Sequence, residues 1–165
     1  MDTGRDGERL FPETEVNANA LQRDGLAGRL QEALPRILDQ QPVRLAYLHG
    51  SMASGQLHPF SDVDLALVVE DGLTSLERLM LILRTQVDVE DECDIPHADV
   101  RIINDAPLVF RGKVVTDGIL LFAKTEQERI GYEVDTRLRY FDYLPIHLGL
   151  QNAFFDDLRE RGLYG

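Results

Sequence analysis

Apolar residues recur every three or four positions between residues 25 and 41, and this spacing predicts a helix. Asp24 can cap its start, and Gln41-Pro42 should end it. Pro35 falls inside the pattern, where it removes a backbone N–H donor, so the helix should kink or restart there. The recurring residues are Leu26, Leu30, Ala33, Leu34, Ile37 and Leu38.

Four short apolar segments predict strands, at residues 43–48, 62–69, 98–104 and 119–122. The second segment is apolar apart from its acidic start, which is typical of a strand buried on both faces. In the third segment, alternation places Asp99 and Arg101 on one face of the sheet and Val100 on the other.

Further helices follow the second and third strands and the last one. Thr74 with Glu77 forms a capping box for a helix that should end before an acidic loop at residues 88–94. Pro107 begins a short helix, and a capping box at Thr125 begins a long one that Pro145 should interrupt. The helical spacing is carried by Leu76, Leu79, Met80, Leu83 and Val87 in the first helix and by Ile130, Val134, Leu138, Phe141, Ile146, Leu150, Phe154 and Leu158 in the long one.

Strands alternating with helices predict an α/β or α+β domain with one covered sheet. Residues 1–24 are polar with little periodicity, and we expect a flexible arm there. The domain should span residues 25–145, and residues 146–165 should form a C-terminal helical extension.

Composition narrows the class of protein. The formal charge of −12 disfavours nucleic acid as a partner and would suit a basic protein surface. No apolar run is long enough to span a bilayer, no signal peptide is visible, and Cys93 is the single cysteine, so we expect a cytoplasmic protein without a membrane partner.

The stretch from residue 49 to residue 65 carries the candidate chemistry. Gly50 lets a ligand approach the backbone closely, and Ser51 can offer its N–H and hydroxyl to a phosphate. Asp62 and Asp64 are two apart on a predicted strand, so both carboxylates point the same way and should repel unless a cation lies between them. A bare Asp-x-Asp is more often a solvated strand end, but Gly-Ser upstream favours a phosphate site beside a metal site.

This pattern of Gly-Ser, ten residues and Asp-x-Asp resembles the minimal nucleotidyltransferases of the DNA polymerase β superfamily. Asp99, on a later apolar strand, matches the third carboxylate of that family. Two further segments, 104–108 and 118–122, resemble the MntA-like antitoxin branch, and the likeness covers about residues 26–145. The resemblance implies a palm-like mixed sheet flanked by helices.

The resemblance also implies roles for these residues. Gly50 and Ser51 would hold the phosphates of ATP, and two Mg²⁺ ions, which Mn²⁺ can replace, would be bound by Asp62, Asp64 and Asp99. Asp99 would also help to deprotonate the attacking hydroxyl. In the antitoxin branch AMP is transferred to a tyrosine of a cognate HEPN-type ribonuclease toxin, and pyrophosphate is released.

The chain departs from the family in one loop. The family commonly has an arginine next to the position of Gly55 or two residues before it, whereas Ala53-Ser54-Gly55 has no base, so a phosphate contact is missing or comes from Arg101 or another residue.

Several other residues can be interpreted either as functional or as ordinary structural residues. A histidine replaces the usual aromatic residue at position 49 and is read as a strand-end residue rather than a phosphate contact. His97 and Arg101 can contact phosphate or pair with carboxylates. His58 and Pro59 suit an ordinary loop, Cys93 an inert thiol, and residues 88–94 a solvated loop rather than a second metal site.

The sequence is therefore compatible with three functions. The first is the AMP-transferring antitoxin. The second is a module that keeps the fold and neutralises its toxin by binding alone, although three retained carboxylates argue against it. The third is a small-molecule nucleotidyltransferase of the aminoglycoside-modifying kind, which usually carries a larger C-terminal domain than the residues after Phe122 supply.

Overall fold

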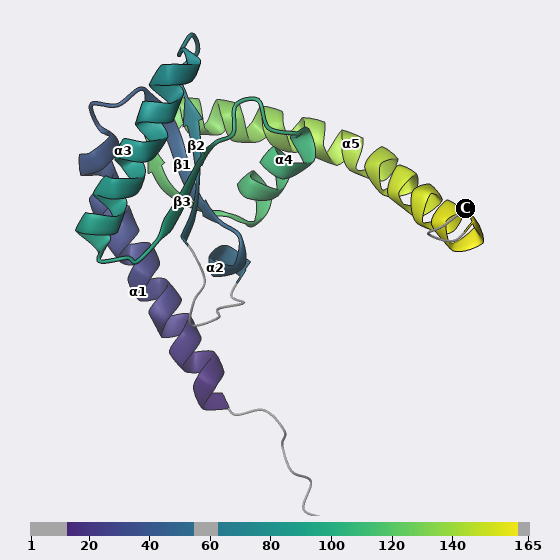
Figure 1. The fold of residues 1–165 in the computed structure, drawn as a ribbon, viewed down its shortest axis with the longest axis horizontal. Helices are drawn as coiled ribbons and strands as arrows, with labels where there is room; N and C mark the ends of the chain where they lie inside the picture. The colour runs from purple at the N-terminus through teal and green to yellow at the C-terminus, as the bar shows by residue number, and fades with distance from the viewer. Residues whose placement is uncertain (1–12, 55–62, 162–165) are drawn as a thin grey trace, which may run out of the picture.

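The computed structural model describes residues 13–54 and 63–161 of the chain. Within these residues a helix precedes the first strand, and short and long helices connect or follow the strands (Figure 1). The elements are α1 (Glu13–Leu38), β1 (Val43–His49), α2 (Ser51–Ser54), β2 (Val63–Val69), α3 (Ser75–Cys93), β3 (Ala98–Ile102), α4 (Leu108–Asp117), β4 (Ile119–Ala123) and α5 (Glu126–Arg161).

The four strands form one mixed sheet in the order β3-β2-β1-β4. β1 is antiparallel to both of its neighbours, whereas β2 and β3 are parallel. The pairing sets His49 beside Asp64, and Asp64 beside Asp99. The mixed sheet flanked by helices confirms the expected fold class.

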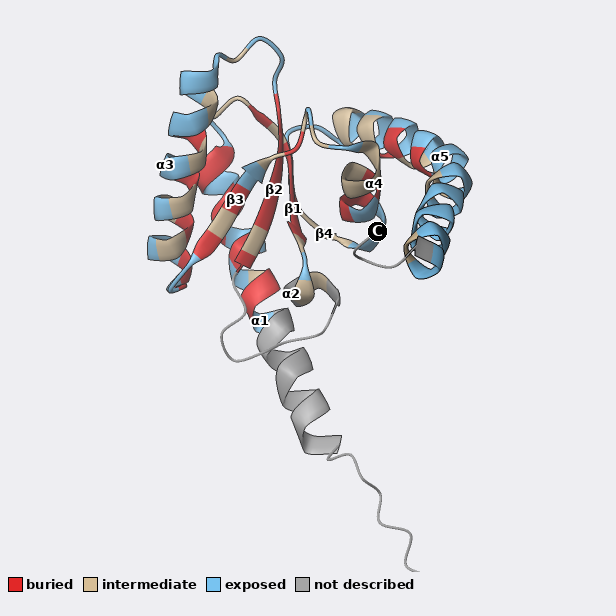
Figure 2. Cartoon of the chain, turned by 45° about the vertical axis from the view of Figure 1, so that its right-hand side comes forward, coloured by how far each residue is buried: buried red, intermediate tan, exposed pale blue. Residues whose placement is uncertain are grey.

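Helices cover both faces of the sheet. α1 and α3 pack on one face, and α4 and α5 pack on the other, as Figure 2 shows. The first face buries Leu30 and Leu65, and the second buries Tyr47 and Val114. Strand alternation therefore decides which side chains of β1 and β2 face α4 and α5.

Both prolines inside the long helices are accommodated without ending them. α1 runs through Pro35 as one helix, and α5 runs through Pro145 from Glu126 to Arg161. A restart at Pro35 and an interruption at Pro145 are therefore wrong, and a kink at Pro35 stays a prediction. Residues on both sides of Pro35, such as Leu34 and Leu38, are fully buried, so packing outweighs the lost hydrogen bond.

Two expected boundaries also move. α1 begins at Glu13, so the helix starts before the expected cap at Asp24, and residues 1–12 lie outside the described residues. α3 continues to Cys93, so most of the acidic run expected as a loop is its last turns. The division of the chain into arm, domain and C-terminal extension stays a prediction.

The apolar residues whose spacing predicts α3 and α5 lie on the outer faces of these helices. α3 is buried through Leu81, Thr85, Val89 and Cys93, while residues such as Leu76 remain 68% exposed. The long helix is buried through Glu133, Thr136 and Tyr140, and its exposed apolar residues include Ile130, Val134, Leu138 and Phe141.

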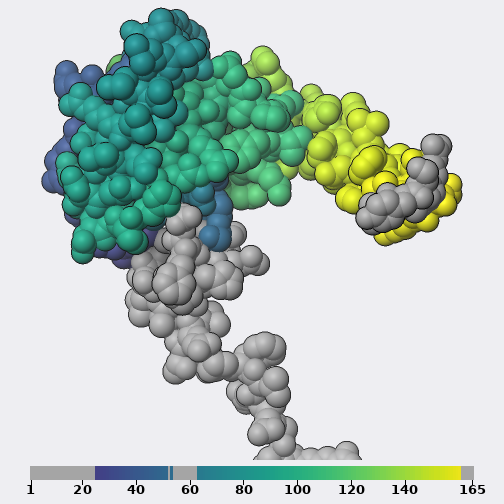
Figure 3. Space-filling view, viewed as in Figure 1, coloured from purple at the N-terminus to yellow at the C-terminus, as the bar shows by residue number. Residues whose placement is uncertain are grey.

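The C-terminal half of α5 projects away from the body of the molecule, as the yellow segment in Figure 3 shows. It carries exposed apolar side chains that nothing in the described part of the chain covers, namely Ile146, Leu148, Leu150, Phe154 and Phe155. Among the described residues, no helix is both long and apolar enough to cross a membrane.

Candidate active site

Gly50 ends β1 in a conformation that a larger residue would disturb. Its φ angle is +75°, in the left-handed region that favours glycine. A Cβ atom at this position would lie 2.4 Å from Oδ2 of Asp64. The residue therefore serves two purposes, because it turns the chain into α2 and leaves room for a carboxylate.

Asp64 and Asp99 lie side by side on the parallel strands β2 and β3. Both point to the face of the sheet that carries α4, since Ala66 on β2 packs into that face and Val100 on β3 packs into the opposite one. Both carboxylates are half-buried. Asp62, expected as their third partner, lies outside the described residues.

Arg101 is bound to Asp99. Its Nε donates to Oδ2 of Asp99 at 2.9 Å, and its Nη2 donates to the same oxygen. Hydrogen bonding to this guanidinium lowers the pKa of Asp99, which keeps the carboxyl group ionised. Of the two roles open to Arg101 in the sequence, the structure shows pairing with a carboxylate.

His49 stands next to Asp64 at the end of β1. Its ring meets the ring of Phe110 edge-on, with centroids 5.4 Å apart. Burial lowers the pKa of His49, and the nearby Asp64 opposes that shift. The Nε2 atom is buried and has no hydrogen-bond partner among the described residues. A buried, unpaired ring nitrogen beside the carboxylates marks this strand end as a place where a ligand can bind.

The remaining candidates divide between the site and its surroundings. Ser51 is the first residue of α2, directly after Gly50, and is half-buried. His97 points to Glu90, with Nδ1 3.6 Å from Oε1. Cys93 is buried, and burial raises the pKa of its thiol, which fits the inert role expected for it. His58 and Pro59 lie outside the described residues.

The carboxylates present offer the kind of ligand that magnesium prefers. Asp64 and Asp99 offer hard oxygen donors from adjacent strands at one edge of the sheet. Within the residues that the structure describes, no group of three acidic, histidine or cysteine side chains is close enough together to hold a metal ion. A cation at Asp99 would compete with Arg101 for the same oxygen.

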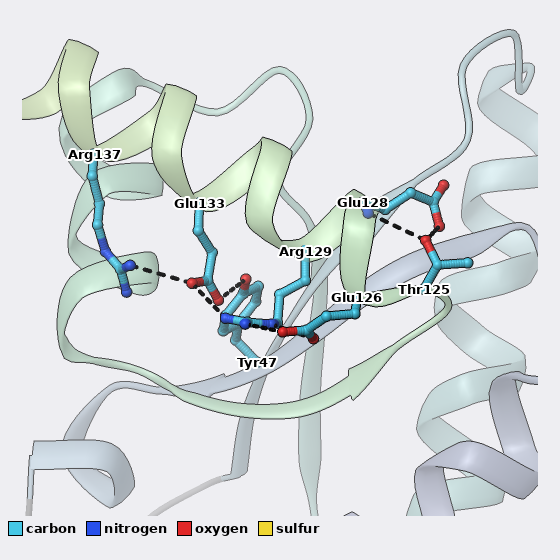
Figure 4. A network of polar contacts seen from close by, with 7 residues as sticks. All are labelled: Tyr47, Thr125, Glu126, Glu128, Arg129, Glu133 and Arg137. Atoms are coloured by element: carbon cyan, nitrogen blue, oxygen red, sulfur yellow. Dashed lines mark hydrogen bonds and ion pairs between the residues drawn. The ribbon is translucent and has the colours of Figure 1, made fainter.

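A buried ionic network behind the site was not foreseen from the sequence (Figure 4). The hydroxyl of Tyr47 on β1 donates to Oε1 of Glu133 on α5 at 3.1 Å. The other oxygen of Glu133 accepts from Arg129 at 3.0 Å and from Arg137 at 3.2 Å. Arg137 also donates to the carbonyl of Val115 on α4 at 2.9 Å. The network fixes both helices to the strand that ends at Gly50.

The sequence offers only a weak signal for this network. A glutamate and two arginines at intervals of four residues are usually a solvated helix face. Here Glu133 is 6% exposed, and burial is the main reason why the pKa of Tyr47 is strongly raised. The pairing across the fold becomes visible only once α5 is placed on the sheet.

Solved structures of similar fold include a toxin–antitoxin complex with AMP-PNP. A chain in that complex is 25% identical, with a TM-score of 0.56, and the match covers 81% of this chain and 98% of that one. A chain in the complex of a tri-AMPylated Shewanella oneidensis HEPN toxin with an MNT antitoxin is 22% identical, with a TM-score of 0.54 and the same coverage, which shows a shared fold. No curated protein matches.

The sequence itself matches a family described as polymerase beta nucleotidyltransferase over residues 32–127, more than half of the chain. The matched segment contains Gly50, Asp64 and Asp99, the residues that the structure brings together. The chain therefore belongs to the polymerase β nucleotidyltransferase family.

Proposed function

We propose that this protein is a cytoplasmic antitoxin that transfers AMP from ATP to a tyrosine hydroxyl of a HEPN-type toxin and releases pyrophosphate. The observation that carries the proposal is the pairing of Asp64 with Asp99 directly beside Gly50, in a chain of this family. The complex of similar fold that contains AMP-PNP supports ATP as the nucleotide.

Each site residue has a role in this reaction. Gly50 and Ser51 bind the nucleotide phosphates at the start of α2. Asp64 and Asp99, with Asp62, would hold magnesium or manganese, which supplies charge neutralisation for the phosphates when bound. Asp99 is ionised and accepts the proton of the attacking hydroxyl. The acceptor oxygen then forms a bond to the α-phosphorus as the bond to the bridging oxygen breaks.

The exposed apolar side of α5 is the candidate surface for the toxin. Apolar residues of this helix such as Val134, Leu138 and Phe141 are at least half exposed, and a large exposed apolar patch is typical of a protein interaction surface. The structures with this fold named above are complexes of an antitoxin with its toxin. The acidic chain, with a formal charge of −12, suits a partner whose surface is basic.

The test is to incubate the protein with labelled ATP, magnesium and the HEPN protein encoded beside it. Label on a toxin tyrosine, located by mass spectrometry, is the expected result. Asp64→Asn serves as the matched control, because it removes one charge from the site and keeps the side-chain shape. Well-folded wild-type protein that leaves the toxin unlabelled would refute the proposal.

Neutralisation by binding alone remains the second candidate, and one observation favours it. Ala53-Ser54-Gly55 contains no basic residue, whereas the family resemblance leads us to expect an arginine there. Asp62→Asn separates the two functions. A binding module carrying this change still protects cells from the toxin, whereas an enzyme carrying it does not.

A further inference from the structure

A cavity of about 300 Å³ opens beside the carboxylates, between the end of β1, α2 and α4. This volume is at the lower end of the range for small-molecule sites, roughly 300–1,000 Å³, so it suits part of a nucleotide rather than all of it. Its wall is formed by His49, Gly50, Ala53, Phe110, Lys113, Val114, Asp117 and Gly118.

The cavity and the carboxylates share one residue. Gly50 lines the cavity, and the space where its side chain would begin is occupied by Oδ2 of Asp64. In the strand order β3-β2-β1-β4, Asp99 and Asp64 come first, then Gly50, and then the cavity next to the start of β4. An α-phosphate held at the carboxylates therefore has the cavity on the side of Gly50, away from Asp99.

Lys113 is the cation in the wall of this cavity. It is exposed on α4 and forms no hydrogen bond or ion pair within the described residues. Arg101, a basic residue next to the carboxylates, is bound to Asp99. The Ala53-Ser54-Gly55 segment contributes no positive charge. Apolar wall residues such as Phe110 strengthen the field of a nearby charge by excluding water.

We propose that this cavity is the subsite for the β- and γ-phosphates of ATP, and that Lys113 supplies the positive charge missing from the Ala53-Ser54-Gly55 segment. This inference rests on the proposed function. When the bond between the α-phosphorus and the bridging oxygen breaks, its electron pair stays on the β-phosphate, which leaves as pyrophosphate. Lys113 stabilises that growing charge from α4.

Asp117 gives the subsite a second, opposing charge. It lies one helical turn after Lys113 on α4, lines the same cavity and is exposed. Its carboxylate repels phosphate oxygens, so Asp117→Asn is expected to tighten pyrophosphate binding a few-fold, the opposite direction to a change at Lys113.

The experiment measures binding of magnesium–ATP, magnesium–pyrophosphate and AMP to the full chain by calorimetry. Lys113→Gln should weaken ATP and pyrophosphate roughly tenfold or more, because it removes a charged hydrogen-bond donor, and should leave AMP within about twofold. Lys113→Arg should restore most of the affinity. Lys124→Gln is the matched control, since Lys124 is the other lysine of the chain and pairs with Glu70 away from the cavity.

Three results would overturn the inference. Unchanged pyrophosphate affinity in Lys113→Gln means that the cavity does not hold these phosphates. An equal loss for AMP and pyrophosphate means that it holds the nucleoside. Wild-type protein that binds no ATP at all overturns the proposed function together with this subsite, and that outcome is distinguished by the wild-type titration alone.

Discussion

Replacing Gly50 with alanine tests whether the end of β1 positions the carboxylate of Asp64. At a φ angle of +75°, any residue with a Cβ costs roughly 1–2 kcal/mol of folding free energy. The new Cβ would also lie 2.4 Å from Oδ2 of Asp64, whereas ordinary contact begins at 3.4 Å. The carboxylate must therefore move by about 1 Å, a displacement that can lower a reaction rate by about 100-fold.

Gly72→Ala is the matched control for this change. Gly72 has a φ angle of +86° but nothing within 4 Å of an added Cβ. Gly72→Ala therefore strains the left-handed backbone without bringing the new Cβ close to another side chain. Urea unfolding should give similar losses of stability for both variants. The initial rate of AMP transfer should fall about 100-fold in Gly50→Ala alone. Equal rates in the two variants would show that Gly50 does not position Asp64.

Further changes test the packing behind the site and its charge. Tyr47→Phe should cost about 1.5–3 kcal/mol in urea unfolding, because it removes a hydrogen bond to the buried Glu133. The raised pKa of Tyr47 means that the folded state holds a proton that the unfolded chain releases above about pH 10, so stability should fall there, less steeply in the variant. Gly112→Ala places a Cβ 2.2 Å from the ring of Tyr140 and should cost about 1–3 kcal/mol, whereas Gly131→Ala, in open space on α5, should add about 0.5–1 kcal/mol. Magnesium or manganese should raise the melting temperature, since either ion binds only the folded site.

Each of these expectations has a contrary result. A Tyr47→Phe protein as stable as the wild type would mean that the buried network adds nothing to folding. Equal effects of alanine at Gly112 and Gly131 would mean that α4 and α5 are not closely packed at Tyr140. A melting curve indifferent to both metals, with and without ATP, would count against the metal site.

Local rules account for part of the arrangement of Gly50, Asp64 and Asp99. Strand alternation puts Asp64 on one face, and the pairing of two apolar strands brings Asp99 beside it. A glycine at the end of a strand is needed for both the turn and the close approach of a carboxylate. The expectation for Asp99 came from the resemblance to the nucleotidyltransferases, because no local rule shows which strands pair.

The sequence did not show which side of a helix is buried where apolar residues lie on more than one side. In α3 the regular spacing of Leu76 and Leu83 predicts a helix correctly, yet both residues face outward while Thr85 is buried. The spacing of apolar residues does not show which of two helix faces is buried when the buried face includes a polar residue. The helical spacing therefore identifies α3 as a helix but does not show which of its sides packs on the sheet.

Contacts between distant segments were equally hidden. Tyr47 meets Glu133 only after α5 has packed across β1, and Lys113 reaches the cavity beside Gly50 only because α4 runs back along the sheet. Neither residue type is unusual in its local stretch. The roles of these two residues depend on where the folded chain places them, and neither composition nor periodicity shows that position.

The most direct test of the central claim is transfer of labelled AMP to the HEPN protein encoded beside this chain. Wild-type protein with magnesium–ATP should label a toxin tyrosine and release one pyrophosphate for each AMP transferred, and Asp64→Asn should do neither. Toxin that is neutralised but carries no AMP would contradict the account, because it would show that the paired carboxylates are not used for nucleotidyl transfer.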